Sequence, residues 1–313
     1  MQVIKPTRLK KGDTIGLISP ASSPDDLSRV EESTRYLEKL GYKVKVGKNV
    51  GNYYGYLAGT DDERLEDLHS MFSDKTVKAI MCLRGGYGAF RLLDKINYKM
   101  IQKNPKIFVG YSEITALQNA IFSKTGLITF AGPMPAVDFV NSISPFTEEW
   151  FWKVVTSNKK IGKVKYPENS KMPFINKGTA NARILGGNLA VFSTMLGTDF
   201  FPDMKDKILL LEDIDEKPYK IDRMLNQLRL AKVFKGLKGV ILGRFVECYE
   251  QDPNKKTLTL GEVIEHYFKV LKIPAIYTFP HGHIKDFITI PIGLKIGLNA
   301  TKGTVEFLES AVS

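Results

Sequence analysis

Ser112 is the first of three polar residues in this sequence that could together hydrolyse a substrate through a covalent intermediate. It occurs in Gly110-Tyr111-Ser112-Glu113, between a buried apolar stretch and a helical pattern. A serine at such a strand-to-helix turn stands at the carboxyl edge of a sheet, where its hydroxyl can act as a nucleophile. The full G-x-S-x-G pattern is incomplete because residue 114 is Ile. A plain serine N-cap therefore stays open as the alternative.

A serine nucleophile needs a base, and the chain has four histidines. His69 and His266 lie in helical patterns, and we expect them to be surface residues or helix residues whose hydrogen bonds are satisfied. His281 and His283 flank Gly282 in a Gly/Pro-rich loop at the edge of a strand, where an imidazole can face a cleft. These two histidines could also form a metal pair, but no third cluster of ligands accompanies them.

The third group would be a carboxylate that orients the base. Glu212 is the first polar residue after the apolar run 208–211, and Asp213 follows it directly. A charge at the carboxyl end of a buried strand is costly unless it is paired, so this position favours a functional role. The alternative is an acidic surface turn, which we expect for Asp215 and Glu216.

A glycine-rich segment, Arg84-Gly85-Gly86-Tyr87-Gly88, follows the apolar stretch 77–82. Such a loop lets backbone N–H groups approach an anion closely. Its spacing matches neither the dinucleotide-binding pattern nor the phosphate-loop pattern. A phosphate cradle and an oxyanion hole therefore both stay open. A further pair, Gly186-Gly187, is expected only to permit a tight turn into a helix.

The elements that must position these residues follow an α/β pattern in the first half of the chain. Strand-like stretches alternate with helical stretches, which predicts βαβ units and a Rossmann-like domain with a mostly parallel sheet. The strand patterns cover 13–19, 42–46, 77–82, 106–109 and 127–131. The helical patterns cover 25–40, 61–72, 113–123 and 147–156.

The second half changes character at 162–177, a Lys-, Pro- and Asn-rich stretch that predicts a linker or crossover. We expect a mixed α/β C-terminal domain, partly antiparallel because apolar and polar residues alternate over 288–307. Its other elements are expected as helices over 188–196, 221–231 and 259–268 and strands over 208–211 and 239–243. The predicted domains are 1–165, with Ser112, and 166–313, with Glu212 and His283.

Composition excludes several classes of protein. The 313 residues are 43% hydrophobic and 25% charged, which excludes disordered, collagen-like and coiled-coil chains. Only two cysteines, Cys82 and Cys248, are present, which favours a reducing compartment. No signal-peptide pattern or apolar run near the roughly 18 residues of a membrane span occurs, so we expect a cytoplasmic protein with no membrane partner.

The net charge of the protein limits the classes of partner that we expect it to bind. The net charge of +11 favours acidic small substrates or polyanions. The basic residues are scattered, and no aromatic stripe interleaves with them, so we expect no nucleic-acid partner.

Six motifs in one order carry a resemblance over nearly the whole chain. With them the sequence resembles the LD-carboxypeptidase family of serine peptidases, which also contains the microcin-C-immunity peptidases. The motifs are residues 16–22, Arg84-Gly85-Gly86-Tyr87-Gly88, Gly110 to Thr115, Leu185 to Leu189, Leu211-Glu212-Asp213 with 218–223, and Gly282-His283 with Pro291-Ile292-Gly293.

The resemblance implies a Ser-Glu-His triad at Ser112, Glu212 and His283. By it, Ser112 attacks the scissile carbonyl, His283 takes and returns the proton, and Glu212 fixes the imidazole tautomer. The oxyanion hole falls on the backbone N–H groups of Gly86 and Glu113.

The implied activity is that of a hydrolase without metal or cofactor that releases terminal D-alanine from murein tetrapeptides in peptidoglycan recycling. Such peptides carry several carboxylates, which suits a basic protein. Candidate substrate-binding residues are Arg84, Tyr87, Arg183 and Arg244. The resemblance also implies a homodimer.

Two other functions stay open. An immunity-type peptidase would cleave aminoacyl-nucleotide conjugates, and such members bind the adenylate partly through aromatic residues of a second-domain loop. The corresponding stretch here, 171–177, has Phe174 and no Trp. A non-catalytic two-domain binding protein would use the glycine loops to cradle a nucleotide or phosphate, but the phosphate-loop spacing is missing.

Overall fold

The computed structural model describes residues 2–140, 142–166 and 172–313, and the chain forms two compact units. The first unit contains Met1–Lys159, Ile288–Gly293 and Ser310–Ser313. The second contains Lys160–Phe287 and Leu294–Glu309. The sequence patterns indicated one boundary near residue 165, and they gave no sign that the chain returns twice to the first unit.

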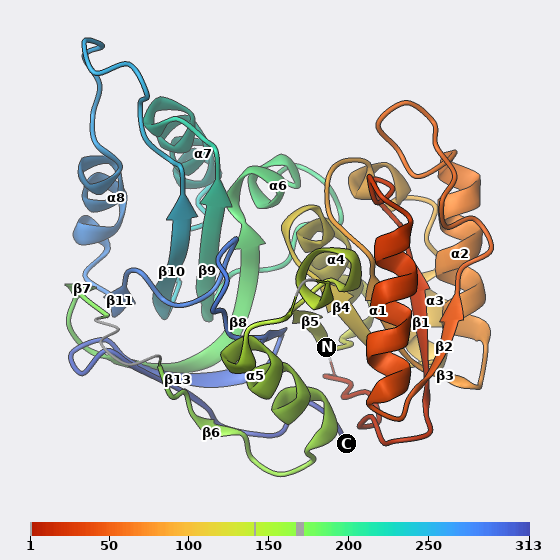
Figure 1. Cartoon of the computed structure of the whole chain (residues 1–313). Helices are drawn as coiled ribbons and strands as arrows, with labels where there is room; N and C mark the ends of the chain where they lie inside the picture. Colours follow the sequence, from red (N-terminus) through yellow and green to blue (C-terminus); the bar gives the residue numbers. More distant parts are fainter. Residues whose placement is uncertain (1, 141, 167–171) are drawn as a thin grey trace. The chain divides into compact units, whose positions relative to one another are not determined.

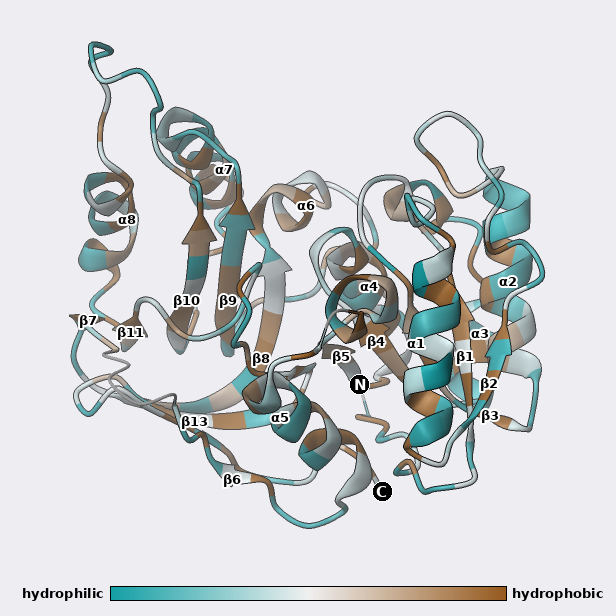
Figure 2. Ribbon diagram, in the orientation of Figure 1, coloured by the Kyte–Doolittle hydropathy of each residue, from teal (hydrophilic) through white to brown (hydrophobic). Residues whose placement is uncertain are grey.

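The first unit is built on a six-stranded sheet with the order β12-β5-β4-β3-β1-β2 (Figure 1). Its five N-terminal strands pair in parallel, as the alternating pattern predicts, and β12 adds an antiparallel edge. The strands are β1 (Thr14–Ile18), β2 (Lys43–Val46), β3 (Val77–Cys82), β4 (Ile107–Gly110), β5 (Thr129–Ala131) and β12 (Ile290–Ile292). The hydrophobic colour of the central strands matches their burial (Figure 2).

Helices cover both faces of this sheet. Because crossovers between parallel strands are right-handed, α1 lies on one face and α2, α3 and α4 on the other. The packing agrees, since α3 contacts both α2 and α4, whereas α1 contacts η3. The helices are α1 (Ser28–Lys39), α2 (Asp61–Ser73), α3 (Tyr98–Lys103), α4 (Thr115–Thr125) and α5 (Pro145–Thr156), with short turns η1 (Ala89–Leu92), η2 (Ser112–Ile114) and η3 (Pro135–Phe139).

The order of the strands creates a switch point between β1 and β3. After β1 the chain moves to β2 on one side, and it then returns to β3 on the other side. Loops that leave neighbouring strands in opposite directions open a crevice at the carboxyl edge of an α/β sheet. The loops after β1 and β3 meet there, and the turn after β4 lies beside them.

The second unit has an eight-stranded mixed sheet with the order β6-β14-β13-β8-β9-β10-β11-β7. The central strands β8 to β11 are parallel, and the outer pairings are antiparallel, as expected for the tail. The strands are β6 (Gly162–Lys163), β7 (Phe174–Asn176), β8 (Thr179–Asn188), β9 (Lys207–Ile214), β10 (Gly239–Val246), β11 (Ala275–Ile276), β13 (Lys295–Asn299) and β14 (Thr304–Phe307).

Three helices and a short turn complete this unit. They are α6 (Leu189–Thr194), α7 (Pro218–Leu230), α8 (Leu260–Phe268) and η4 (Lys269–Leu271). The crossovers from β8 to β11 all step in one direction, so the three helices pack on one face, with α7 between α6 and α8. Figure 1 shows these helices alongside β8, β9 and β10. No helix in the described ranges is both long and apolar enough to cross a membrane.

Two local expectations for the second unit were wrong. The stretch 162–177 contains β6 and β7 at its ends instead of being only a linker, and 167–171 lie outside the described residues. Gly186 and Gly187 belong to β8 and do not form a turn. A Cβ on Gly186 would lie 2.0 Å from the carbonyl oxygen of Leu210, so glycine is needed for the close approach of β8 to β9.

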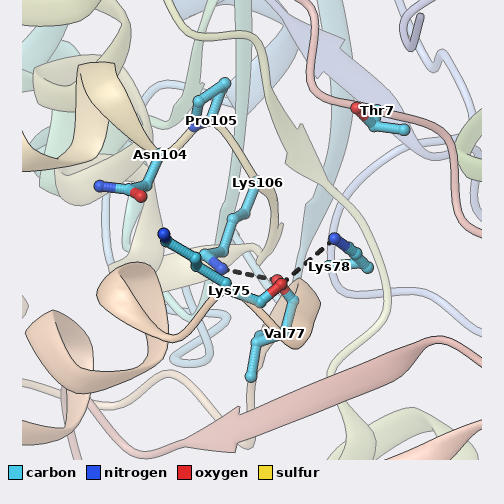
Figure 3. Close-up of a pocket in the computed structure, with 7 residues that line it drawn as sticks. All are labelled: Thr7, Lys75, Val77, Lys78, Asn104, Pro105 and Lys106. Carbon is cyan, nitrogen blue, oxygen red and sulfur yellow. Dashed lines mark hydrogen bonds between the residues drawn. The ribbon is translucent and has the colours of Figure 1, made fainter.

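The amino edge of the six-stranded sheet carries a separate cavity of about 320 Å³ (Figure 3). Lys106 lines it and is buried, and its ammonium group donates to the carbonyl oxygens of Asp74 and, at 2.6 Å, Val77. Burial lowers the pKa of Lys106 to about 8. The ammonium group thus joins the beginnings of β3 and β4, away from the edge that carries Ser112.

Candidate active site

Ser112 stands on a strained turn between β4 and α4. Its φ of 60° lies in the left-handed region, which costs a residue other than glycine about 1 kcal/mol or more. The alternative of an N-cap is wrong, because Tyr111 precedes η2, Ile114 precedes α4, and neither helix receives a side-chain cap. The backbone thus holds the Ser112 side chain half-buried at the carboxyl edge of the sheet.

The glycine loop after β3 lies against this turn. A Cβ on Gly85 would lie 3.2 Å from Ser112 Oγ and 3.5 Å from the backbone nitrogen of Glu113. A Cβ on Gly86, whose φ is +104°, would lie 2.3 Å from Ser22 Oγ. Glycine at 85 therefore keeps open the space beside the Ser112 hydroxyl, and glycine at 86 permits the close approach of Ser22.

Two backbone donors of the glycine loop, and that of Ala89 just after it, are already used within the protein. Tyr87 N donates to Ser22 Oγ at 3.1 Å. Gly88 N and Ala89 N donate to Glu113 Oε1 at 2.8 and 2.9 Å. In the part of the chain that the structure describes, the N–H groups of Gly86 and Glu113 make no hydrogen bond. The loop thus presents these donors beside Ser112.

The side chains of Glu113 and Arg64 fix the glycine loop through hydrogen bonds to its backbone. Burial raises the pKa of Glu113, although the N–H groups of Gly88 and Ala89 act in the opposite direction. The buried guanidinium of Arg64 donates to the carbonyl oxygens of Pro20 and Gly88 at 2.8 and 2.7 Å. These two side chains tie the loops after β1 and β3 to the turn at Ser112.

In the second unit, Glu212 and His283 form a pair. Glu212 lies near the end of β9 and is 1% exposed, and its Oε2 lies 2.9 Å from Nδ1 of His283. An imidazole with one nitrogen held by a carboxylate has a fixed orientation and leaves the other nitrogen to exchange a proton. The His283 side chain is 17% exposed, so it lies at the surface of this buried pair.

The turn before His283 is shaped by close contacts. Gly282 has φ of +128°, and a Cβ there would lie 2.9 Å from Glu212 Oε2. The backbone N–H of Arg244 donates to the carbonyl oxygen of His281 at 2.9 Å, which attaches the turn to β10. Glycine at 282 is thus required by both the backbone and the buried carboxylate.

His281, the other histidine of this loop, has different surroundings from His283. His281 is buried, with its ring edge-on to Phe287. Among the residues that the structure describes, no group of three or more His, Cys, Asp or Glu side chains could hold a metal ion. The structure thus gives no third ligand to a histidine pair.

Sequence reasoning gave no role to Asn188 and left that of Asp213 undefined. Asp213 Oδ1 accepts from Asn188 Nδ2 at 2.9 Å, and Oδ2 accepts from Ala190 N at 3.0 Å. Burial and the charge of Glu212 raise the pKa of Asp213 to about 7. Because successive side chains of a strand face opposite sides, Asp213 anchors the start of α6 while Glu212 faces His283.

The candidate substrate-binding residues fall in different places. In the first unit, Arg84 pairs with Asp25 at 2.7 Å, and Tyr87 is exposed on the glycine loop. In the second unit, Arg244 is exposed beside the His281 turn. Arg183 pairs with Glu309 at 3.3 Å.

Strand register separates Arg183 from the Glu212–His283 pair. Arg183 lies opposite Lys207, and Asn188 lies opposite Glu212. The five steps along the strand from Lys207 to Glu212 span about 16 Å. The structure therefore brings the backbone of Arg244 to the turn before His283 and does not bring Arg183 there.

Comparison with protein families gives two matches that together cover most of the chain. Residues 15–132 match the LD-carboxypeptidase N-terminal domain, and residues 181–298 match the LD-carboxypeptidase C-terminal domain. The first match contains Ser112, and the second contains Glu212 and His283.

Individual relatives align over nearly their full lengths. A probable murein peptide carboxypeptidase of Bacillus subtilis is 41% identical and aligns over 99% of this chain and 95% of its own. The crystal structure of a muramoyltetrapeptide carboxypeptidase from Oxalobacter formigenes has a TM-score of 0.82 at 29% identity, covering 93% and 97% of the two chains. The microcin C7 self-immunity protein MccF, a name that an Escherichia coli relative carries, has a TM-score of 0.89 in complex with aspartyl sulfamoyl adenosine, at 27% identity and with 99% and 100% covered.

Proposed function

Because the chain belongs to the LD-carboxypeptidase family and is a serine-type peptidase, we propose that it releases the terminal D-alanine of murein tetrapeptides. The Glu212–His283 contact of 2.9 Å carries the proposal, because it is the pairing that an acyl-transfer base requires. The names of the Bacillus subtilis and Oxalobacter formigenes relatives support a murein peptide as the substrate.

In the proposed reaction, Ser112 Oγ attacks the carbonyl carbon of the bond to D-alanine while His283 Nε2 takes the hydroxyl proton. Glu212 holds Nδ1 and stabilises the imidazolium cation. When the tetrahedral intermediate collapses, the C–N bond breaks and His283 returns the proton to the leaving amine. Water, deprotonated by His283, then hydrolyses the Ser112 ester and restores the enzyme.

Two unbonded N–H groups support an oxyanion hole at Gly86 and Glu113. Other donors of the same loop are used by Ser22 and Glu113, but these two make no hydrogen bond within the described residues. Fixed donors aimed at a developing oxyanion contribute about 2.7–4 kcal/mol each to transition-state stabilisation. We propose that they stabilise the negative oxygen of the intermediate.

The substrate's carboxylates need cations, and we propose that Arg84 and Arg244 supply them. Arg84 already shares its guanidinium with the exposed Asp25 carboxylate, which a substrate carboxylate can replace. Arg244 is exposed and makes no ion pair in the part of the chain that the structure describes. Arg183 stays a weaker candidate because of its distance along the strand from Glu212.

The same proposal includes a cytoplasmic role in peptidoglycan recycling and a homodimeric enzyme. Both rest on the family resemblance. Fractionation of the producing cells and sedimentation of the purified protein test them, and a monomer at working concentration would remove the homodimer from the proposal.

The reaction is tested by mass-spectrometric detection of D-alanine released from purified murein tetrapeptide. We expect release by the wild type and a loss of at least about a thousandfold in rate for Ser112→Ala. Ser193→Ala, a buried serine at the end of α6, is the matched control and should stay near the wild-type rate. An intact tetrapeptide with the wild type would refute the recycling function.

The similarity to MccF makes an aminoacyl-nucleotide peptidase the second candidate. Phe174 is the aromatic residue of the loop in question, is 45% exposed, and has the Lys177 ammonium 5.5 Å from its ring centroid. Lys171, at the start of the stretch, lies outside the described residues. Aspartyl sulfamoyl adenosine is therefore included as a second substrate, and its exclusive cleavage would favour this candidate.

A further inference from the structure

Exposed tyrosines lie on the glycine loop that faces Ser112 and on the segment 54–57, and Ser22 joins the backbones of Tyr56 and Tyr87. Tyr54, Tyr56 and Tyr87, which we call the tyrosine platform, are 62%, 67% and 54% exposed. Large aromatic side chains contribute much of the energy of recognition when they are covered, so a cluster of exposed ones marks a binding surface. The platform belongs entirely to the first unit, which also carries Ser112.

Hydrogen bonds to backbone atoms hold the chain segments that carry the tyrosine platform. Ser22 Oγ donates to the carbonyl oxygen of Tyr56 at 2.7 Å and accepts from Tyr87 N at 3.1 Å. The N–H of Ala58 donates to the carbonyl oxygen of Ala21 at 2.9 Å, and Tyr53 Oη donates to that of Pro24 at 2.6 Å. The exposed rings therefore stand on a fixed frame, which reduces the entropy lost when a ligand binds.

The frame also places the platform near the nucleophile. Tyr87 follows Gly85 by two positions, so their Cα atoms lie at most about 7 Å apart. Gly85 is the residue whose Cβ position lies 3.2 Å from Ser112 Oγ. The rings of Tyr56 and Tyr87 meet edge to face, with centroids 5.2 Å apart and planes at 80°. They form a corner with two apolar faces.

We propose that the tyrosine platform binds the pyranose ring of the sugar attached to the amino end of the peptide, an inference that rests on the proposed function. The leaving D-alanine offers one methyl group and a carboxylate, and the peptide carries mainly charged groups. The C–H face of a sugar ring is the broad apolar surface of such a molecule. It fits an aromatic corner, whereas a carboxylate needs a cation.

A nucleobase is the other flat ligand that stacks on tyrosine, and the loop argues against it. A nucleotide brings a phosphate or its sulfamoyl equivalent, which needs free donors near the base. The donors nearest the platform, Tyr87 N, Gly88 N and Ala89 N, are bonded to Ser22 and Glu113. Of the donors that make no hydrogen bond within the described residues, those at Gly86 and Glu113 are the ones that the oxyanion requires, and those at Gly85 and Arg84 lie two and three residues before Tyr87.

The test compares kcat/KM for disaccharide-tetrapeptide with kcat/KM for the free tetrapeptide. We expect the wild type to prefer the sugar-bearing substrate by about tenfold or more, and Tyr56→Ala to remove this preference. For Tyr56→Ala, kcat/KM for the free tetrapeptide should change by less than about threefold, because the frame uses the backbone carbonyl oxygen of Tyr56 and not its ring. Tyr87→Phe should retain the preference, and Tyr249→Ala, at an exposed tyrosine of the second unit, is the matched control.

Each other outcome overturns a specific step. No preference in the wild type, or an equal loss for both substrates, would refute sugar binding while leaving the proposed function intact. A preference for aspartyl sulfamoyl adenosine that depends on the platform would assign it to a nucleobase. If the wild type cleaves neither murein substrate, the proposed function fails.

A binding measurement then decides the platform by itself. NMR titration of Ser112→Ala with the disaccharide alone should shift the ring resonances of Tyr56 and Tyr87 and leave those of Tyr249 unchanged. Unshifted resonances at saturating disaccharide would refute the inference, whatever the peptidase assay shows.

Discussion

The turn at Ser112 and the turn at His283 hold their polar side chains by different means. At Ser112 the backbone does it, through a left-handed φ of 60° and a glycine loop packed against the hydroxyl. At His283 a buried side chain does it, because Glu212 Oε2 lies 2.9 Å from Nδ1. The position of the Ser112 hydroxyl therefore depends on the main chain, and that of the His283 imidazole depends on one carboxylate.

The two buried glutamates show the same difference. Glu113 and Glu212 each stand at or just beyond the end of a buried strand, and both are almost inaccessible. Glu113 accepts from the backbone N–H groups of Gly88 and Ala89, whereas Glu212 accepts from an imidazole. One carboxylate thus shapes a loop, and the other orients an imidazole.

Exchange of each glutamate for glutamine should separate these roles, with the largest expected effect at Glu212. We expect Glu212→Gln to lower kcat by about a thousandfold or more, because an amide stabilises no imidazolium and can favour the wrong tautomer. Glu113→Gln keeps a carbonyl oxygen for both N–H groups and should stay within about tenfold of the wild type. D-Alanine release over pH 5–9 measures both variants.

The pH profile distinguishes positioning from simple damage. Loss of orientation at His283 should change the shape of the kcat profile for Glu212→Gln, while Glu113→Gln should keep the wild-type shape. Equal losses in the two variants, with unchanged profiles, would show that both carboxylates are only structural.

The two glycines that approach these side chains provide a second, smaller contrast. Gly282→Ala puts a Cβ 2.9 Å from Glu212 Oε2 at φ of +128°, so we expect a loss of about a hundredfold in kcat together with about 1–2 kcal/mol of stability. Gly85→Ala crowds Ser112 Oγ at 3.2 Å without a left-handed φ. It should lower kcat about tenfold with little change in stability.

Steady-state kinetics and urea unfolding of both glycine variants check this contrast. Gly12→Ala, where no atom lies near the added Cβ but φ is +88°, controls for backbone strain alone. A Gly282→Ala enzyme that loses stability but retains kcat would show that the Glu212–His283 pair tolerates the crowding.

Much of the first unit could be predicted from its residues because parallel strands and crossover helices leave strong local patterns. The apolar stretch 77–82 and the helix beginning at Asp61 appear in the structure where the pattern indicates. β8 was missed, since Thr179–Asn188 contains two glycines that suggest a turn, and only the approach to Leu210 explains them. Tertiary contact thus overrode a local signal.

The candidate site was predictable in its residue types but not in its supports. Ser112 and Glu212 follow apolar runs, and this local pattern suggested a polar group at a strand end. Ser22, Arg64 and Asn188 act through hydrogen bonds to residues more than twenty positions away, which no local pattern contains. The choice of His283 over His281 came from the family resemblance, and the Glu212 contact supports it.

Asp213 should make stability depend on pH in the unit that carries Glu212. The pKa of its carboxyl rises from the ordinary value of 3.8 to about 7 in the folded protein, so between these values the folded state binds more protons than the unfolded state. This contribution to stability is therefore present at low pH and is lost as the pH rises towards about 7. Asp213→Asn removes this pH-dependent contribution and also the hydrogen bond that Ala190 N donates to Asp213 Oδ2.

Urea unfolding at pH 5 and pH 8 measures the effect. We expect Asp213→Asn to be less stable than the wild type by about 1–3 kcal/mol at pH 5 and by a smaller margin at pH 8. A margin that is the same at both pH values, or larger at pH 8, would contradict the raised pKa of Asp213.

The smallest expected effect is the energy stored in the backbone at Ser112. A residue other than glycine is destabilised by about 1–2 kcal/mol in the left-handed region. Glycine avoids this cost, but its greater conformational freedom in the unfolded state offsets up to about 1 kcal/mol of the gain. Ser112→Gly should therefore be about 0.5–1 kcal/mol more stable than Ser112→Ala, although both lack the hydroxyl and are inactive. Urea unfolding of the two variants measures the difference.

Glu212→Gly against Glu212→Ala is the contrasting pair, because Glu212 has an ordinary strand conformation and glycine there should be the less stable variant. A glycine penalty at both positions would mean that the nucleophile turn stores no strain, and the difference between the two turns would then lie in side-chain contacts alone.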